Sequence, residues 1–180
     1  MNTRAAFLDR DGIINKDSGY VHKWTDFVFE DGIFDLLTEL QQQHYALIVI
    51  TNQSGIARGF YSEEDLLRLH QKMVNEFLRK GIIISEISYC PHHIHGKVLE
   101  YAVTCQCRKP KPGMILKAAT KLDLDLKKSI VIGDNISDMD AGRQAGVKDN
   151  FLVSRKYIRE DGFLRFRSLK SLHSYLISKR

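Results

Sequence analysis

The chain has 180 residues, of which 43% are hydrophobic and 27% charged, with a formal net charge of +5 at pH 7. This composition is typical of a globular protein with a substantial core and excludes a low-complexity or largely disordered chain. No apolar run approaches the ~20 residues that a membrane-spanning helix needs, and the N-terminus has no signal-peptide cleavage site. We therefore expect one cytoplasmic domain over residues 1–180, without a membrane partner and with its thiols reduced.

The positive charge is concentrated near the C-terminus. Residues 155–180 hold eight Lys or Arg against two acids, so this basic tail carries +6 and the remainder of the chain −1. One interpretation is a surface for nucleic acid or another polyanion. The other is a solvated terminal helix with Leu169, Leu172 and Leu176 packed inward. The second is favoured because no nucleic-acid signature of glycines and aromatic residues accompanies the charge.

Short apolar runs predict strands, and longer segments with apolar residues at helical spacing predict helices between them. In chain order these are 5–8 (strand), 31–43 (helix), 46–50 (strand), 62–81 (helix), 83–89 (strand), 112–122 (helix), 129–133 (strand), 137–146 (helix) and 151–153 (strand). In the second helix, Ser62 followed three residues later by Asp65 predicts a capping box, and Gly81 predicts the end. Because strands alternate with helices, we predict an α/β fold with a mostly parallel sheet and helices on both faces.

Polar residues with chemical potential follow three of these strands. Asp9 and Asp11 come after the run "AAFL", Thr51 and Asn52 after "ALIVI", and Asp134 after "SIVIG". Ligands of parallel α/β sheets bind at the carboxyl ends of the strands, so these side chains should meet at one edge. Each aspartate alone is more simply read as a helix cap or strand end, but three at one edge favour a shared site.

Such a set of residues suits phosphate chemistry with magnesium. Neighbouring carboxylates repel unless a cation lies between them, and Mg²⁺ prefers carboxylate, water and phosphate oxygens. One carboxylate can attack phosphorus to give an aspartyl phosphate, while a second donates and then accepts the proton. Lys109 in "RKPKPG", with Thr51 and the amides after it, can offset the charge on the phosphoryl oxygens.

The three cysteines of the chain lie in one short segment, residues 90–107. Cys90-x-His92 is followed after twelve residues by Cys105-x-Cys107, which is the layout of a closed tetrahedral zinc site. A site with four protein ligands has no open position for water, so this zinc would be structural. The alternative for the cysteines is apolar packing, and the spacing leaves His93 and His95 open as rivals of His92. The remaining histidines are expected to have no metal role: His22, His44, His70 and His173.

Four motifs in order resemble those of the haloacid dehalogenase (HAD) phosphatase superfamily. They are "FLDRDG", "VITNQSG", "CRKPKPG" and "IVIGDNISD", within residues 5–153. Four further stretches, "GYVH", "TNQSGIARG", "CPHH" and "CQCRKPKPGM", resemble a branch with a minimal cap and a zinc-bearing loop. The resemblance implies a three-layer Rossmann-like fold and a magnesium-dependent phosphatase.

The resemblance also implies roles for individual residues. Asp9 would be the nucleophile and Asp11 the general acid/base, and Mg²⁺ would be held by Asp9, the Asp11 main chain and Asp134. Thr51 and Lys109 would stabilise the phosphoryl group. The residues implied to line the substrate are Asp17, Ser18, Gly19, Tyr20, Thr51, Asn52, Gln53, Ser54, Arg108, Lys109 and Asn135. Asn135 stands where members of the family more often have a lysine. Asp138 is a weaker metal candidate that would orient Lys109 or cap its helix instead.

The family pattern favours His92 as the fourth zinc ligand. The zinc would then fix the backbone next to Arg108 and Lys109, so that a structural metal shapes the phosphate site. Within the branch we expect a sugar bisphosphate as substrate and a monomer, with a histidinol-phosphate phosphatase as the alternative. A nucleic-acid 3′-phosphatase fits less well, since such enzymes usually add a second domain. A zinc-stabilised nucleic-acid-binding module is the alternative from another class, but it leaves Asp9, Asp11 and Asp134 without a purpose.

Overall fold

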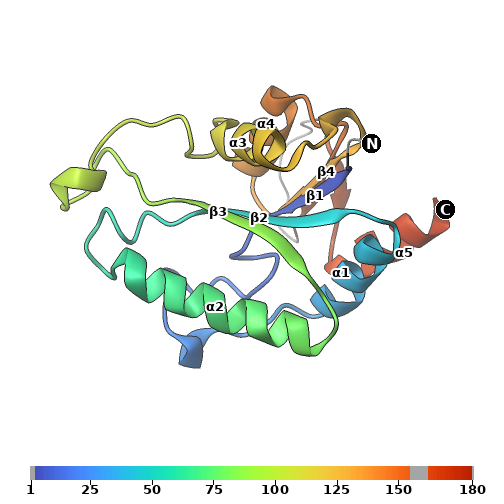
Figure 1. Cartoon of the computed structure of the whole chain (residues 1–180), viewed down its shortest axis with the longest axis horizontal. Helices are drawn as coiled ribbons and strands as arrows, with labels where there is room; N and C mark the ends of the chain where they lie inside the picture. The colour runs from blue at the N-terminus through green and yellow to red at the C-terminus, as the bar shows by residue number, and fades with distance from the viewer. Residues whose placement is uncertain (1–2, 155–161, 180) are drawn as a thin grey trace.

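A six-stranded, fully parallel sheet forms the centre of the computed structural model, which describes residues 3–154 and 162–179 (Figure 1). The spatial order of the strands is β3-β2-β1-β4-β5-β6. The strands are β1 (Ala5–Leu8), β2 (Ala46–Asn52), β3 (Ile84–Cys90), β4 (Ile130–Gly133), β5 (Asp149–Val153) and β6 (Leu164–Phe166). The central strands β1 and β4 are buried along their whole length, because helices cover both faces of the sheet.

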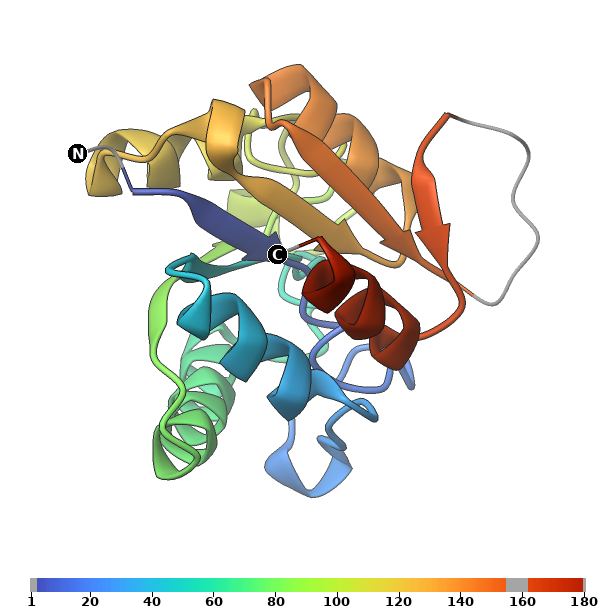
Figure 2. The same ribbon diagram turned by 90° about the vertical axis from the view of Figure 1, so that its right-hand side faces the viewer.

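Helices lie on the two faces of the sheet in unequal numbers (Figures 1 and 2). One face carries α1 (Ile33–Gln42), α2 (Glu63–Arg79) and α5 (Leu169–Ser178). The other carries α3 (Gly113–Leu122) and α4 (Ile136–Ala145). The predicted α/β fold, with a parallel sheet between two layers of helices, is confirmed.

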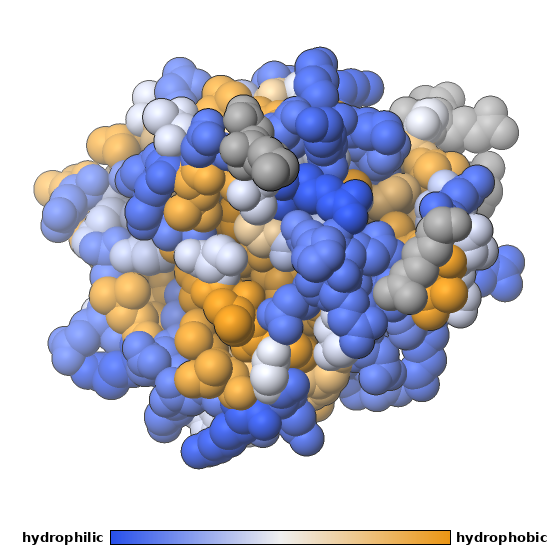
Figure 3. Space-filling model, turned by 45° about the vertical axis from the view of Figure 1, so that its right-hand side comes forward, coloured by the Kyte–Doolittle hydropathy of each residue, from blue (hydrophilic) through white to orange (hydrophobic). Residues whose placement is uncertain are grey.

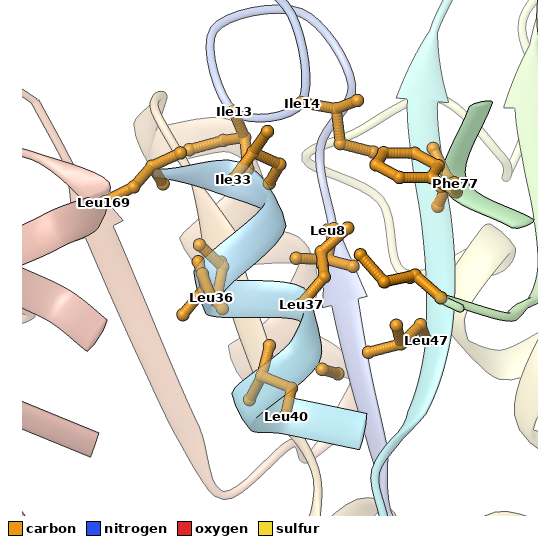
Figure 4. Packing of buried hydrophobic residues seen from close by; sticks show 14 of the residues in the cluster. Leu8, Ile13, Ile14, Ile33, Leu36, Leu37, Leu40, Leu47, Phe77 and Leu169 are labelled. Atoms are coloured by element: carbon orange, nitrogen blue, oxygen red, sulfur yellow. The ribbon is translucent and has the colours of Figure 1, made fainter. Parts of the chain in front are cut away.

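The larger core lies between the sheet and the helices α1, α2 and α5 (Figure 4). Leu36, Leu37 and Leu40 of α1 are fully buried beside Leu8 of β1 and Leu47 of β2. Truncating such a residue to alanine typically costs about 2–5 kcal/mol, since the lost contacts leave a cavity. This packing fixes the sheet that carries the polar residues at its carboxyl edge.

The predicted elements agree with the structure, with differences at their ends. The capping box of Ser62 and Asp65 is present, and Gly81 follows α2 with φ +73°. β2 runs to Asn52 rather than Ile50, because Thr51 and Asn52 still pair with β3. β6 was not predicted, because Arg165 interrupts its apolar residues and the strand lies in the segment that was interpreted as a basic tail.

The segments after β1 and β3 stay small. Besides bridges and turns, they contain only the short 3₁₀ helices η1 (Trp24–Asp26) and η2 (Leu99–Tyr101) among the described residues, and a third, η3 (Leu126–Lys128), precedes β4. After Cys90, the last residue of β3, residues 91–107 form a loop that projects beyond the carboxyl end of the strand, at the left of Figure 1. This architecture agrees with the minimal cap implied by the family.

The end of the basic tail is a packed helix. Leu169, Leu172 and Leu176 of α5 are buried against the core, as the second interpretation of the tail predicted. Residues 155–161 and 180 of the tail lie outside the described residues. Among the described helices, none has the length and apolar character needed to cross a membrane. Figure 3 shows mostly hydrophilic side chains on one face, with apolar side chains gathered in its lower middle.

Candidate active site and metal centres

A cavity of about 360 Å³ opens at the carboxyl edge of the sheet. Its walls come from the segments after β1, β2 and β4 and from the segment before α3. The lining residues are Asp9, Asp11, Asp17, Gly19, Tyr20, Thr51, Asn52, Gln53, Ser54, Tyr61, Arg108, Lys109, Asp134, Asn135, Ser137 and Asp138. The structure thus brings the predicted residues together, with one exception: Ser18 is exposed and does not line the cavity. Their individual roles stay predictions.

Lys109 lies at the bottom of this cavity, almost fully buried. Its Nζ is 2.9 Å from Asp9 Oδ1 and 2.6 Å from Asp138 Oδ1, and it donates to the Ile50 carbonyl at 2.8 Å. The Asn52 side chain holds the Lys109 backbone, accepting from its N–H and donating to its carbonyl, both at 3.1 Å. The amide of Asn52 is therefore already used to position Lys109.

Charges in this cluster shift each other's proton affinity. Burial alone would lower the pKa of Lys109, but Asp138 and Asp9 outweigh burial and raise it, so the ammonium stays charged. Burial raises the pKa of Asp9 well above its usual range, and the Asp138 charge adds to the shift while Lys109 opposes it. Burial, assisted by Asp138, raises the pKa of Asp134 to about 6. A cation bound between the carboxylates would oppose the rise in the pKa of Asp9 and of Asp134.

The donor set fits magnesium. Carboxylate oxygens of Asp9, Asp134 and Asp138 lie within 4.8 Å of one another, and hard oxygen ligands suit Mg²⁺. Asp138 is already engaged, because Oδ1 pairs with Lys109 and Oδ2 accepts from the Asn135 N–H in the capping box of α4. Asp9 and Asp134 are therefore the carboxylates that would hold the ion. Asp138 contacts Lys109 and also caps α4, which are the two roles considered for it from the sequence.

Three neighbouring side chains donate hydrogen bonds to the Asp11 carboxylate. Arg10 Nη2 lies 2.9 Å from each of its oxygens, and Asn15 Nδ2 donates to Oδ1 at 2.9 Å. Gln53 Nε2 donates to Oδ2 at 2.9 Å. No role for Arg10, Asn15 or Tyr61 was predicted from the sequence. Ser137, which lines the cavity, was not predicted either. Arg10 carried the only signal, since it separates the two aspartates of "FLDRDG".

The zinc-loop residues form a compact second cluster. Ligand atoms of Cys90, His92, Cys105 and Cys107 lie within 4.8 Å of one another, with Cys90 Sγ 3.6 Å from Cys105 Sγ and His92 Nδ1 3.3 Å from Cys107 Sγ. The edges of a tetrahedron with bonds of ~2.3 Å are of this size, so the set fits zinc. The hydrogen bond between the two thiols lowers the pKa of Cys107 to about 5 although burial opposes it, and the same bond, with burial, raises the pKa of Cys90. The assignment of zinc therefore rests on the geometry and chemistry of the four ligands.

The rival histidines lie outside this cluster. His93 Nε2 contacts Arg58 Nη2 at 3.2 Å, and His93 Nδ1 accepts from the His95 backbone N–H at 3.1 Å. The preference for His92 agrees with this arrangement. Arg108 follows the last cysteine and reaches back, with Nη1 donating to the His92 carbonyl at 3.4 Å. The zinc loop and the active-site cavity are thus joined through Arg108.

The chain is similar to a family model, to phosphatases of other bacteria and to a solved crystal structure. The family described as "HAD-hyrolase-like" matches residues 106–156. The D-glycero-alpha-D-manno-heptose-1,7-bisphosphate 7-phosphatase of Campylobacter jejuni is 46% identical over 179 residues, 99% of each chain. The D-glycero-beta-D-manno-heptose-1,7-bisphosphate 7-phosphatase of Pasteurella multocida is 47% identical over 88% of this chain and 86% of its own. The crystal structure of D,D-heptose 1,7-bisphosphate phosphatase from B. bronchiseptica, complexed with magnesium and phosphate, has a TM-score of 0.83 at 29% identity, covering 98% of this chain and 99% of that chain.

The parallel sheet, the paired aspartates after β1 and the buried lysine define a phosphatase of the HAD superfamily. Within that class, the chain belongs to the D-glycero-D-manno-heptose-1,7-bisphosphate 7-phosphatase family.

Proposed function

We propose that this chain is a magnesium-dependent phosphatase that removes the 7-phosphate of D-glycero-D-manno-heptose 1,7-bisphosphate through an aspartyl phosphate on Asp9. The observation that carries the proposal is the Lys109–Asp9 contact of 2.9 Å at the bottom of a cavity that also holds Asp11 and Asp134. The names of the relatives supply the substrate. The product would serve the synthesis of nucleotide-activated heptose for lipopolysaccharide.

In the first half of the reaction, Asp9 acts as nucleophile. Its Oδ1 already accepts from the Arg10 N–H at 2.7 Å and from Lys109, whereas Oδ2 accepts no hydrogen bond from the described residues. One oxygen is therefore free to bond to phosphorus as the bond from phosphorus to the sugar oxygen breaks. Asp11 gives its proton to that leaving oxygen. Thr51 and Lys109 stabilise the charge on the phosphoryl oxygens, and bound Mg²⁺ would add to that stabilisation.

In the second half, water hydrolyses the aspartyl phosphate. Asp11, now ionised, takes the proton of the attacking water, and Asp9 is released with inorganic phosphate. Arg108 and the segments around Gly19 and Ser54 line the cavity beyond the reacting phosphate, where the rest of the sugar would lie. Because the cap is minimal, these loops would supply the selectivity. We further propose that the chain works as one cytoplasmic, monomeric domain.

A phosphate-release panel tests this function. The substrates are both anomers of heptose 1,7-bisphosphate, histidinol phosphate and a 3′-phosphorylated oligonucleotide, each with Mg²⁺ and with a chelator. We expect the highest kcat/KM on a heptose bisphosphate, and loss of at least about 10³-fold in Asp9→Asn, because the nucleophile is removed. Asp35→Asn is the matched control, since Asp35 is exposed on α1 outside the cavity.

Other outcomes would identify another function. Faster turnover of histidinol phosphate would reassign the substrate within the HAD branch. Binding of nucleic acid that weakens steeply with salt, without phosphate release, would favour the zinc-stabilised binding module. Activity that survives Asp9→Asn would contradict the proposed mechanism.

A further inference from the structure

Arg10 is a fully buried guanidinium placed directly behind Asp11. Its Nη2 contacts Asp11 Oδ1 and Oδ2 at 2.9 Å each, and its Nε contacts Oδ1 at 3.2 Å. A buried charge is costly unless it is paired, and Asp11 is the one carboxylate that pairs with Arg10 in the described part of the chain. The side chain of Asp11 remains 22% exposed and lines the cavity, which Arg10 does not.

The rest of the guanidinium is fixed by neutral groups. Nη2 donates to the Val21 carbonyl at 2.7 Å, and Nη1 lies 3.2 Å from His70 Nε2. Burial, assisted by the Arg10 charge, lowers the pKa of His70 to about 3, so the imidazole is neutral and can accept this hydrogen bond. Arg10 therefore has little freedom to move, and its fork presents two donors in a fixed plane.

A second set of contacts holds Asp11 from another direction. Gln53 Nε2 donates to Asp11 Oδ2 at 2.9 Å and to Thr51 Oγ1 at 2.8 Å. The Tyr61 hydroxyl donates to Gln53 Oε1 at 2.6 Å, which orients the amide. Tyr61 reaches this position because residue 55 is glycine: a Cβ there would lie 2.1 Å from the Tyr61 ring. The side chain of Gln53 is thus buried and engaged at both ends, so it acts on Asp11 and Thr51.

We propose that Arg10 and the Tyr61–Gln53 pair are positioning residues that hold the Asp11 carboxyl group where it meets the leaving oxygen. The proposal rests on the proposed function, in which Asp11 donates the proton. Arg10 favours the ionised form of Asp11, and the negative charge of the bound phosphate would offset Arg10 and let Asp11 carry the proton. Proton transfer requires hydrogen-bond distance to the reacting oxygen, and a displacement of about 1 Å can cost about 100-fold in rate. Neither Arg10 nor Tyr61 needs to touch the substrate for this effect.

The test uses the dependence on the leaving group. When the phosphate ester of a sugar is cleaved, the departing alkoxide needs a proton, whereas p-nitrophenolate departs with little help. The value of kcat/KM covers steps only up to the first irreversible one, so it isolates the departure step from later hydrolysis. The variants are Arg10→Lys, which keeps the charge without the fork, and Tyr61→Phe, which removes one hydroxyl. Asp11→Asn is the reference for a lost acid.

Arg4→Lys is the matched control. Arg4 stands just before β1, at the opposite end from Asp9, and its Nε donates to the Gln43 carbonyl at 3.0 Å. We expect kcat/KM on the heptose bisphosphate to fall about 10-fold or more in Arg10→Lys and about 3-fold or more in Tyr61→Phe, mostly through kcat. On p-nitrophenyl phosphate, both variants should stay within about 2-fold of the wild-type chain. Arg4→Lys should match the wild-type chain on both substrates.

Equal losses on the two substrates, or no loss on either, would overturn the proposal. If Arg10→Lys does not fold, as judged by its thermal unfolding, Tyr61→Phe decides by the same criterion. If the wild-type chain turns over the aryl phosphate too slowly to measure, the division of the loss between kcat and KM decides. The proposed function fails separately, when the wild-type chain releases no phosphate or when Asp11→Asn behaves like the wild-type chain.

Discussion

Lys109 Nζ and Asp138 Oδ1 form a 2.6 Å ion pair at the bottom of the cavity, with both side chains at least 98% buried. The same ammonium is 2.9 Å from Asp9 Oδ1. Lys109 therefore divides its charge between the proposed nucleophile and a second carboxylate. Asp138 limits how strongly Lys109 holds Asp9 and leaves the ammonium directed at the phosphate site.

The Asp138→Asn variant should lower kcat without changing the magnesium requirement. Its amide oxygen can still cap α4, but Lys109 then pairs with Asp9 alone, which weakens Asp9 as a nucleophile. We expect kcat to fall about 10–100-fold, the usual effect of a partner that orients a reacting group. The measurement is a titration of activity with Mg²⁺. The variant Asp134→Asn removes a proposed magnesium ligand and should raise the Mg²⁺ concentration that gives half-maximal activity. If Asp138→Asn raised this Mg²⁺ concentration as much as Asp134→Asn does, Asp138 would also be a magnesium ligand.

Gly12 is required beside Asp134. Its φ is +87°, and a Cβ there would lie 2.3 Å from Asp134 Oδ2. Gly12→Ala should therefore displace a proposed magnesium ligand and raise the Mg²⁺ concentration needed for half-maximal activity. Gly81→Ala is the matched control, because Gly81 also has positive φ, +73°, but no atom within 4 Å of the added Cβ. If both variants lose stability alike and neither changes the magnesium requirement, the steric argument is wrong.

The succession of the first five strands along the chain, the helices between them and the meeting of Asp9, Thr51 and Asp134 were predictable from the sequence, whereas the spatial order of the strands was not predicted. Buried apolar runs mark parallel strands, and polar residues after such runs must gather at one edge of the sheet. The three cysteines of the zinc loop were predictable from their spacing, whereas His92 was preferred over the two rival histidines only through the family resemblance. These features follow from the spacing of residue types along the chain, which can be read from one sequence.

Side-chain partners across loops were not predictable in the same way. Asn52 and Gln53 are adjacent, yet Asn52 binds the Lys109 backbone while Gln53 reaches Asp11. Their directions depend on the backbone path after β2. The position of Arg10 between two aspartates was visible in the sequence, but its burial was not predictable, because such an arginine is usually a surface residue and its burial depends on Val21 and His70 from other segments.

His70 should make the protein sensitive to acid. Its pKa is about 3 in the folded chain, against 6.5 for an ordinary histidine, because burial and Arg10 oppose its charge. Below pH 6.5 the unfolded chain binds a proton at His70 that the folded chain does not, so the free energy of unfolding falls as pH falls, by up to about 1.4 kcal/mol per pH unit. The contribution is fully present above pH 6.5 and is lost progressively down to about pH 3.

The variant His70→Gln isolates this effect. Glutamine retains an acceptor for Arg10 but does not titrate, so the slope of unfolding free energy against pH between about 6 and 4 should become shallower. Denaturant unfolding at a series of pH values measures it. His173→Gln is the control, since His173 on α5 is not buried. The same slope in His70→Gln and in the wild-type chain would show that His70 is not the acid-sensitive group.

Loss of zinc should impair the phosphate site through the backbone. Cys107 precedes Arg108 and Lys109 directly, and Arg108 also donates to the His92 carbonyl at 3.4 Å. Cys107→Ser and His92→Gln should therefore each lose the metal, unfold at lower temperature and show kcat/KM reduced about 10-fold or more, since Lys109 is no longer held in place. Metal content, thermal unfolding and steady-state kinetics measure these three effects. His93→Gln, a histidine of the same loop outside the cluster, should retain its zinc. If Cys107→Ser lost zinc and kept full turnover and substrate affinity, the metal would shape the loop without acting on Lys109.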